Sequence, residues 1–446
     1  MPGECSSRSI SKPERISRSD DGSALSPGKV DSINPSALRE IDRCEVCNND
    51  HLTPVLDLGL HPLCDDLVPV GDPRICREYP IEILFCENCR TAHQRFQIPK
   101  RELFPPSYHY RARFTADVLK GMASLVDACE ERSGSLKDST VLDLGCNDGS
   151  LLDFFRARGA KTLGVEPTDA AEEAEEKGHL IFRDYLSEEL AETIAAAHGQ
   201  PDFITFTNVF AHIENLREVI AALKRLSGAQ TVVVIENHYL GAVLEGNQFD
   251  TFYHEHARTY SYTSFLHLAE SLNVKVLSVE FPERYGGNIR VFFGHGDGET
   301  QARADIELRE RRFPEKFKHL QQDVTRWRET RGRALREEVH RVGKLAAKAF
   351  PARAAILIKL LGLDEEQISA VYEKPGSLKI GHYVPGTRIP IRSDEELLAL
   401  ADQTRPLLNL AWHIPQEIRS YMAELGYTGS IVDILSKDEF ETGLPT

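Results

Sequence analysis

The chain has 446 residues, of which 41% are hydrophobic and 27% are charged, so it can form several globular domains. Its formal net charge of −16 argues against nucleic acid or an anionic membrane as a partner, because both require a basic face. The sequence has no run of roughly 20 apolar residues, and its first residues lack the apolar segment of a secretory signal. We therefore expect a cytoplasmic protein.

Residues 1–38 are rich in Ser, Arg, Asp, Gly and Pro and contain few large apolar residues, which predicts a disordered tail. Residues 39–100 combine short apolar runs with Gly, Pro and paired cysteines. This pattern is typical of a small, loop-rich module that a metal ion holds together.

Two C-x2-C motifs lie in this segment, 38 residues apart. Each motif can direct two thiolates at one ion, and together they supply the tetrahedral sulfur set that Zn²⁺ favours. A redox pair is the weaker interpretation, because thioredoxin-like chemistry uses one such motif. With all four positions filled by protein, the zinc is expected to be structural. The predicted ligands are Cys44, Cys47, Cys86 and Cys89, whereas Cys64 and Cys76 are expected in the core.

Strand-like apolar runs alternate with helix-length amphipathic stretches over residues 101–300, which predicts a largely parallel sheet covered by helices on both faces. Residues 301–345 are charge-dense with apolar residues near helical spacing, which predicts a long solvated helix that links two domains. The remainder of residues 301–446 again mixes apolar runs with turns. We expect a second α/β domain there.

A Gly-rich turn follows the first strand of the predicted sheet, in Asp143-Leu-Gly-Cys-Asn-Asp-Gly149. Dinucleotide and phosphate-loop fingerprints are absent, and D-x-G-x-x-x-G resembles the first motif of Rossmann-like methyltransferases. Glu166 ends the next strand, 23 residues after Asp143, where a carboxylate can bind both ribose hydroxyls; a surface residue beside a helix N-cap is the alternative. Asp184 suits either the adenine or a plain turn. The predicted cofactor-binding residues are Asp143, Gly145, Asn147, Gly149, Glu166 and Asn208.

Two further polar segments follow predicted strands, Asn208 to His212 and Glu236 to Tyr239. Ligands gather at the carboxyl ends of parallel strands, so both segments are expected to border the cofactor pocket.

The densest polar cluster is Tyr253-His254-Glu255-His256, which is costly to bury without partners and should face a cleft. Histidine suits removal of a proton next to a carbonyl, and Glu can orient it. A metal pair formed by His254 and His256 is the alternative, although the sequence offers no third ligand.

Ordered motifs over most of the chain resemble the nucleotide-sugar C-methyltransferases, which make branched deoxysugars for antibiotics and surface glycans. The resemblance runs from Cys44 to about Ile391. Its motifs are the paired cysteines, VLDLGLHPLCDDLV, EYPIEILFCENC, SYHYRARFT, DLGCNDGSLL, NVFAHIENL, FDTFYHEHARTYS, ERYGGNIRVFF and YVPGTRIPI.

The resemblance implies a zinc module, a Rossmann-like methyltransferase core that binds S-adenosylmethionine (SAM), and a C-terminal α/β domain that binds substrate. Its members methylate the carbon next to the keto group of a nucleotide-linked 4-keto-deoxyhexose, usually C3. By resemblance His256 is the general base, Glu255 and Tyr253 are its companions, and Tyr110 faces the substrate, with Tyr108 as the second choice. We expect a small-molecule substrate and a monomer or weak homodimer.

The sequence departs from the family at three places, one of which is the tyrosine motif YHYRARFT, where Ser often follows. Residues 345–353 read LAAKAFPAR where a Gly-rich turn is common, and Tyr285 stands where His is common. Two other functions therefore stay open: C-methylation of a non-sugar enolisable carbonyl compound, and a non-catalytic role in which the zinc module serves protein association.

Overall fold

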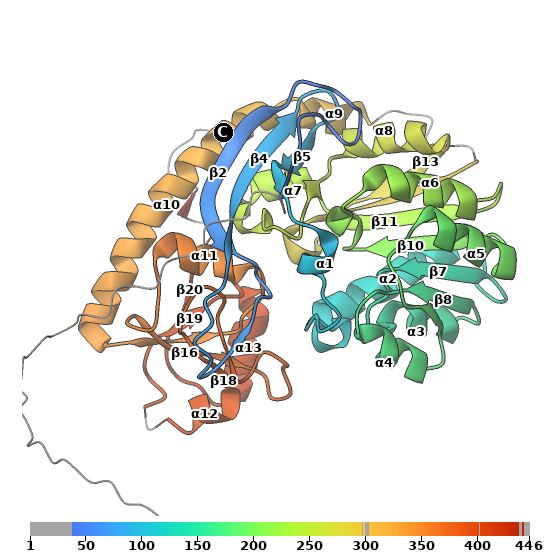
Figure 1. Cartoon of the computed structure of the whole chain (residues 1–446). Coiled ribbons are helices and arrows are strands. Elements are labelled where there is room, and N and C mark those ends of the chain that lie inside the picture. The colour runs from blue at the N-terminus through green and yellow to red at the C-terminus, as the bar shows by residue number, and fades with distance from the viewer. Residues whose placement is uncertain (1–37, 297, 299–302, 401, 437–438, 441–446) are drawn as a thin grey trace, which may run out of the picture. The chain divides into compact units, whose positions relative to one another are not determined.

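The computed structural model describes residues 38–296, 298, 303–400, 402–436 and 439–440 (Figure 1). The predicted disordered tail, apart from Leu38, lies outside the described residues, and so does the side chain of Tyr285. In the described part of the chain, no helix is both long enough and apolar enough to span a bilayer.

The N-terminal module is built on an antiparallel sheet in the order β12-β5-β4-β2. Its edge strand β12 belongs to a later part of the chain and pairs with β5 in the register Arg258 to His93 and Thr259 to Ala92. The module therefore shares its sheet with the segment that directly follows His256. The strands here are β1 (Arg39–Glu40), β2 (Thr53–Pro62), β4 (Glu78–Cys86), β5 (Thr91–Gln94), β6 (Phe96–Gln97) and β12 (Arg258–Thr259), and the helix α1 (Lys100–Leu103) follows them.

The central domain contains a seven-stranded sheet in the order β13-β14-β11-β10-β7-β8-β9, in which β14 alone runs antiparallel to its neighbours. Side chains alternate between the two faces of the sheet. Val141 belongs to an apolar cluster that includes residues 118–129 and 151–155, and Leu142 belongs to a larger cluster that includes residues 191–194 and 216–226. The strands are β7 (Thr140–Leu144), β8 (Lys161–Val165), β9 (Leu180–Phe182), β10 (Phe203–Thr207), β11 (Val232–His238), β13 (Lys275–Glu280) and β14 (Asn288–Gly294).

Helices α3 to α6 each connect two successive strands of this sheet, whereas α2 precedes β7, and α7 and α8 lie between β11 and β13. Their bounds are α2 (Ala116–Ser133), α3 (Ser150–Ala157), α4 (Ala170–Glu176), α5 (Glu188–His198), α6 (Leu216–Leu226), α7 (Leu240–Glu245) and α8 (Tyr262–Leu272), with short 3-10 turns η3 (Phe210–His212) and η4 (Phe249–Thr251). The turn η4 opens the segment that carries His256.

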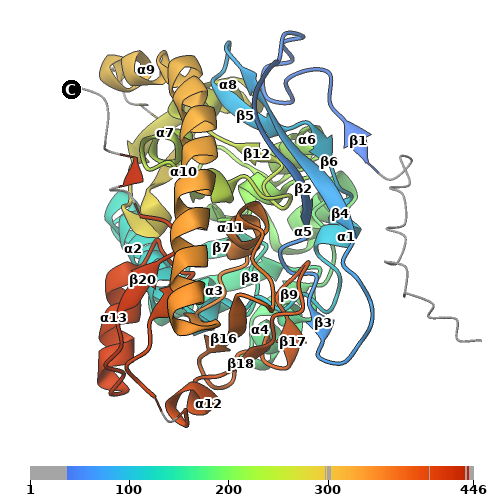
Figure 2. The same cartoon turned by 90° about the vertical axis from the view of Figure 1, so that its left-hand side faces the viewer.

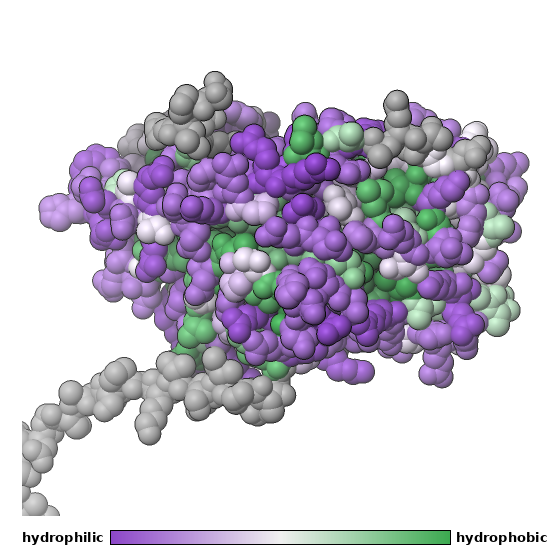
Figure 3. All heavy atoms as spheres, turned by 90° about the horizontal axis from the view of Figure 1, so that it is seen from above, coloured by the Kyte–Doolittle hydropathy of each residue, from purple (hydrophilic) through white to green (hydrophobic). Residues whose placement is uncertain are grey.

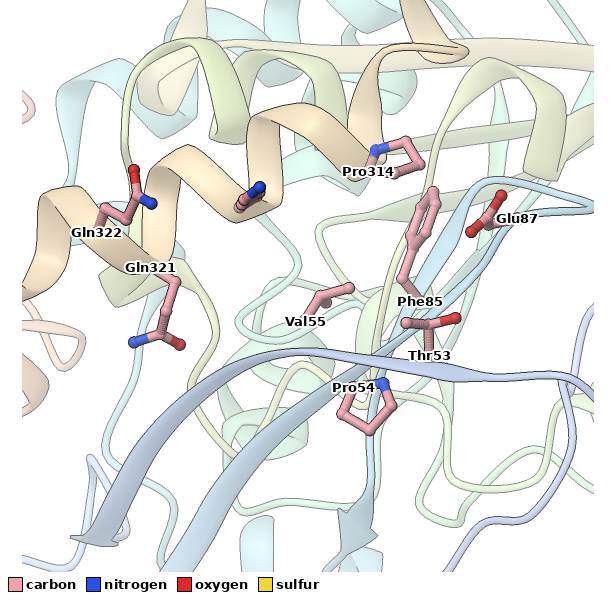
Figure 4. Close-up of a pocket in the computed structure, with 9 residues that line it drawn as sticks. Thr53, Pro54, Val55, Phe85, Glu87, Pro314, Gln321 and Gln322 are labelled. Carbon is pink, nitrogen blue, oxygen red and sulfur yellow. The ribbon is translucent and has the colours of Figure 1, made fainter.

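The predicted long helix is present as α10 (Phe313–Val342), which follows the short α9 (Ala304–Glu310). The expected solvation holds for only part of its surface, because one stripe of α10 that includes Phe317, Leu320 and Trp327 is buried. The helix packs on β2, α7 and α11, as Figure 2 lets the reader follow. A shallow hollow lies between its first turns and β2, lined by Val55, Phe85, Gln321 and neighbours (Figure 4).

The C-terminal domain has a five-stranded, fully parallel sheet in the order β18-β16-β15-β19-β20. After β15 the chain adds β16 and β18 on one side of that strand, and then β19 and β20 on its other side. The strand order therefore reverses between β15 and β19. The strands are β15 (Leu345–Lys348), β16 (Ile368–Glu373), β18 (Ile391–Ser393), β19 (Leu407–Asn409) and β20 (Ile431–Asp433), and the helices are α11 (Ala354–Leu361), α12 (Asp394–Leu398) and α13 (Pro415–Glu424).

One small ladder joins this domain to the N-terminal module, because β17 (His382–Tyr383) pairs with β3 (Val68–Pro69). The face seen in Figure 3 is mostly hydrophilic, in keeping with the charged composition. The predicted architecture is present: a small N-terminal module precedes a central α/β domain with a largely parallel sheet and a second α/β domain.

Candidate active site and metal centre

The two C-x2-C motifs come together as predicted. The sulfur atoms of all four cysteines lie within 4.8 Å of one another, with Cys44 and Cys89 3.3 Å apart and Cys47 and Cys86 3.6 Å apart. Each motif is followed by a residue in the left-handed region, Asn48 (φ 61°) or Arg90 (φ 59°), whose N–H donates back to the first cysteine of its motif. These tight turns direct two thiolates to one side, and the all-sulfur set fits Zn²⁺.

Polar groups surround the sulfur cluster and can stabilise thiolate charge. Asn49 Nδ2 lies 3.5 Å from Cys86 Sγ, Thr91 Oγ1 lies 3.0 Å from Cys89 Sγ, and His93 Nε2 lies 3.3 Å from Cys44 Sγ. Cys64 and Cys76 are buried outside the cluster, as expected, and the Cys76 thiol donates to the Asp66 carbonyl.

The turn between β7 and α3 forms a backbone cradle. Gly145 and Gly149 have φ of 74° and 73°, and Asn147 also lies in the left-handed region at 49°. A Cβ on Gly145 would come within 2.7 Å of the Val209 methyl groups, so only glycine lets the turn lie so close to the end of β10. The open backbone at the N-terminus of α3 fits a cofactor that approaches the chain closely.

Glu166 stands at the end of β8, beside this turn. Its carboxylate accepts hydrogen bonds from the N–H of Asn147 (3.0 Å), from the N–H of Thr168 (2.9 Å) and from the Thr168 hydroxyl (2.6 Å). Burial raises its pKa above the usual value. These three hydrogen bonds fix the carboxylate at the carboxyl end of β8.

Asp143 is buried within β7, and its Oδ1 accepts from the Thr205 hydroxyl at 2.7 Å. Desolvation raises its pKa to about 7. Asn208 ends β10 with φ 55°, and its Oδ1 accepts from Asn288 Nδ2 at 3.3 Å. Asp184 is exposed, and its carboxylate accepts from the N–H of Tyr185, the contact of a plain turn.

His256 lies in the loop between η4 and β12, and its side chain is only 5% exposed. Its Nδ1 is 2.8 Å from the Thr251 carbonyl oxygen. Because a carbonyl can only accept, Nδ1 carries the proton, and the lone pair of the neutral ring lies on Nε2. Desolvation and the neighbouring imidazoles of His212 and His238 hold the pKa of His256 well below its ordinary value.

Aromatic rings enclose His256 on several sides. The ring of Tyr253 lies 4.2 Å away, His212 is stacked at 5.1 Å and His238 lies at 5.4 Å, all between centroids. Burial lowers the pKa of His212 to about 4 and that of His238 to about 3. Sequence reasoning placed both histidines at strand ends but did not count them among the site residues; their position after buried strands was the available signal.

Glu255 points to a different partner, the hydroxyl of Tyr108, which donates to its Oε2 at 3.1 Å. Burial, together with the nearby Asp65 charge, raises the pKa of Glu255 to about 8. The ring of Tyr110 is 40% exposed, and the backbone carbonyl of this residue accepts from Asn147 Nδ2. The structure therefore brings Tyr108 to Glu255, and Tyr110 to the cofactor turn.

His254 faces away from His256. Its Nε2 donates to the Tyr79 carbonyl at 3.1 Å, and its ring meets the Tyr79 ring edge-on at 6.0 Å. The two histidines thus do not share a face, and among the described residues the four cysteines form the only cluster suited to a metal. This geometry favours a base over a metal pair.

The loop of residues 248–257, here called the catalytic loop, is held from two sides. From the N-terminal module, Gln94 Nε2 donates to the carbonyls of Phe252 and Tyr253, both at 3.2 Å, and its N–H donates to the Ala257 carbonyl. From the C-terminal domain, Arg353 pairs with Asp250. Residues far apart in the sequence therefore set the position of His256.

Comparison with known proteins matches each part of the chain to a family model. A zinc binding domain matches residues 44–104, a methyltransferase domain matches 109–279, and a C-methyltransferase C-terminal domain matches 283–433. The C-methyltransferase NovU of Streptomyces niveus is 30% identical over 390 residues, which cover 85% of this chain and 92% of NovU. This chain belongs to the C-methyltransferase family that includes NovU.

Two more distant similarities cover smaller shares of the chain. A ubiquinone biosynthesis O-methyltransferase of Acinetobacter baylyi is 32% identical over 104 residues, 22% of this C-methyltransferase and 42% of that relative. The solved PH0226 protein of Pyrococcus horikoshii is 15% identical with a TM-score of 0.34, over 44% of this chain and 98% of that one. The three family models, NovU and the four-cysteine cluster together identify the protein as a SAM-dependent C-methyltransferase with a zinc-binding module, and its cofactors are SAM and Zn²⁺.

Proposed function

We propose that this C-methyltransferase acts on a nucleotide-linked 4-keto-deoxysugar and methylates the carbon next to the keto group, at C3. The proposal rests on the resemblance of the ordered sequence motifs and on one observation in the site. The hydrogen bond from His256 Nδ1 to the Thr251 carbonyl leaves the lone pair of the buried ring on Nε2, where it can act as a base. Such a base suits removal of a proton that a neighbouring carbonyl has made acidic.

His256 removes the C3 proton through Nε2 while the Thr251 carbonyl keeps the proton on Nδ1. The imidazolium that forms shares its positive charge with that carbonyl through the same hydrogen bond. The low pKa of His256 keeps the ring neutral, and therefore competent as a base, over the physiological pH range.

Glu255 stabilises the oxygen that becomes negative as the proton leaves. Its raised pKa keeps the carboxyl group protonated near neutral pH, so it can donate a hydrogen bond to an enolate oxygen. Tyr108, which is bonded to Glu255, orients this carboxyl group. Tyr253 packs against the His256 ring and excludes water from the base.

SAM, when bound at the β7–α3 turn, supplies the electrophilic methyl group. Glu166 would hold its ribose, and Gly145, Asn147 and Gly149 would let the backbone approach it. The cradle lies at the end of β7, next to β10 and its Asn208, so the cofactor and the substrate meet at one edge of the sheet.

The nucleotide of the substrate is assigned to the C-terminal domain, because open α/β sheets bind ligands where the strand order reverses, here between β15 and β19. Residues 345–353 lack the Gly-rich sequence that is common in the family, but the chain still turns there. Ala349 has φ 60°, in the left-handed region that glycine favours.

The pH dependence of kcat/KM is expected to have a plateau that ends near pH 8. Activity rises at acid pH as His256 loses its proton, below the ordinary histidine range because its pKa is lowered. Activity falls above about 8 as Glu255 loses its proton. A Glu255→Gln variant stays neutral and should lack the alkaline limb while it keeps the acid limb. An unchanged alkaline limb would remove Glu255 from this role.

The substrate assignment is tested by incubation with SAM and a panel of ketones. The panel contains thymidine- and uridine-diphosphate 4-keto-6-deoxyhexoses, the same sugars without the nucleotide, and non-sugar β-ketoacids. NMR of the product reports whether the new methyl group is on C3 or on C5, which the C4 carbonyl also acidifies. Methylation at C3 of a sugar nucleotide supports the proposal. Turnover of the ketoacids alone would favour a non-sugar substrate.

A further inference from the structure

A buried ion pair links the C-terminal domain to the catalytic loop. Arg353 Nε and Nη2 donate to Asp250 Oδ2 and Oδ1 at 2.8 and 2.5 Å, a two-pronged arrangement. The indole N–H of Trp412 donates to Asp250 Oδ2 at 2.8 Å, and the Arg353 guanidinium lies 5.4 Å from the Trp412 ring centroid. Asp250 is fully buried and Arg353 is 7% exposed.

The carboxylate is one residue away from the group that orients His256. Asp250 and Thr251 belong to η4, whose closing hydrogen bonds run from Thr251 N–H to Gln248 and from Phe252 N–H to Phe249. Thr251 is fully buried, and its carbonyl accepts from His256 Nδ1. The contacts that hold η4 in place therefore also hold the Thr251 carbonyl. This carbonyl is the acceptor that decides which ring nitrogen of His256 carries the proton.

We infer that Arg353, through Asp250, is a positioning residue for the catalytic base. Together with Trp412 it holds η4 so that the Thr251 carbonyl keeps His256 in the form protonated on Nδ1, with the lone pair on Nε2. The inference deepens the proposed function and rests on it for the role of His256. It also gives the C-terminal domain a part in proton removal besides substrate binding.

A second buried ion pair helps to distinguish a positioning role of Arg353 and Asp250 from a role in fold stability alone. This second pair, Lys348 and Asp394 in the C-terminal domain, has a comparable Nζ to Oδ1 distance of 2.7 Å, with both side chains under 4% exposed. Its other partners are the Tyr372 carbonyl and the Tyr421 hydroxyl, both within the C-terminal domain. Lys348 and Asp394 thus form a matched control of the same chemistry without a contact to the catalytic loop.

The first measurement needs no substrate. The nitrogen chemical shifts of ¹⁵N-histidine-labelled full-length protein report which ring nitrogen carries the proton, and the His256 signal is assigned by its loss in His256→Gln. We expect Nδ1 to be protonated in the wild type. In Asp250→Asn, and in the Asp250→Asn/Arg353→Gln double variant that leaves no lone buried charge, the proton should move partly to Nε2. The Lys348→Gln/Asp394→Asn control should keep the wild-type signal.

The second measurement is steady-state methyl transfer to the best ketone of the panel described above. The double variant should lower kcat by about 10- to 100-fold with KM within about threefold, because the base is misplaced and binding is not. A rise in KM alone would identify Arg353 as a substrate ligand and overturn the inference. So would an unchanged His256 signal in a folded double variant, even if the double variant loses stability.

The two proposals fail in different ways. If His256→Ala retains full turnover, the proposed base is wrong whatever the NMR signals show. If His256→Ala is inactive while the double variant keeps both the wild-type tautomer and wild-type kcat, only the positioning role of Arg353 is wrong.

Discussion

His256→Ala is expected to lower kcat of methyl transfer by about 10²- to 10⁴-fold, the usual contribution of a general base. SAM affinity should stay nearly constant, because the predicted cofactor contacts lie on β7, β8 and β10 and not on the catalytic loop. Loss of the ring removes the Nε2 lone pair, which is the base in the proposed reaction. Turnover and calorimetric SAM binding measure the two effects separately.

Solvent exchange sharpens this test. In deuterium oxide without a methyl donor, the wild type should exchange the acidic C3 hydrogen of the substrate, and His256→Ala should not. His254→Ala is the matched control, since this neighbouring histidine is equally buried but bonds to the Tyr79 carbonyl. It should lower stability and leave the exchange rate of the folded protein near that of the wild type. Undiminished exchange in His256→Ala would leave Tyr253 or Tyr108 as the next candidate base.

Removal of the zinc is expected to unfold the N-terminal module. Structural Zn²⁺ contributes about 10 to 16 kcal/mol of apparent binding free energy in small zinc modules, more than the whole stability of many domains. Cys86→Ser should reduce bound zinc below about half an equivalent and lower the midpoint of thermal unfolding. Metal analysis and thermal denaturation measure both quantities.

The structure adds a catalytic consequence to the loss of zinc. Cys89 lies two residues before Thr91, where β5 starts, and β5 both pairs with β12 and carries Gln94, which holds the catalytic loop. Activity should therefore fall together with the metal content. Cys76→Ser is the control, because Cys76 is buried outside the cluster and should leave the zinc in place. Full activity in a zinc-free protein would contradict the support that we assign to the module.

Local patterns in the sequence determined much of this protein. The spacing within each C-x2-C motif predicts a thiolate pair because so short a segment can form a tight turn that brings its two cysteines together. The two pairs meet as expected. Gly145 and Gly149 indicate the cofactor turn because their backbone conformations exclude most other residues. Alternation of strand-like and helical runs predicts two α/β domains, since hydrophobic periodicity directly reflects which face is buried.

Only the tertiary structure decided which side chains meet. Tyr108 and Tyr110 are two residues apart, yet Tyr108 contacts Glu255 and the Tyr110 ring is 40% exposed. His254 and His256 look alike in the sequence, but their partners are the carbonyls of Tyr79 and Thr251.

Contacts between residues far apart in the sequence could not be predicted from any local pattern. Arg353 reaches Asp250 across 103 residues, and β12 completes a sheet whose other strands lie far earlier in the chain. The physical reason is that local spacing constrains the backbone over a few residues. The partner of a buried charge depends instead on how separately folded layers pack, and the chain offers many carboxylates that an arginine could have paired with before packing selected one.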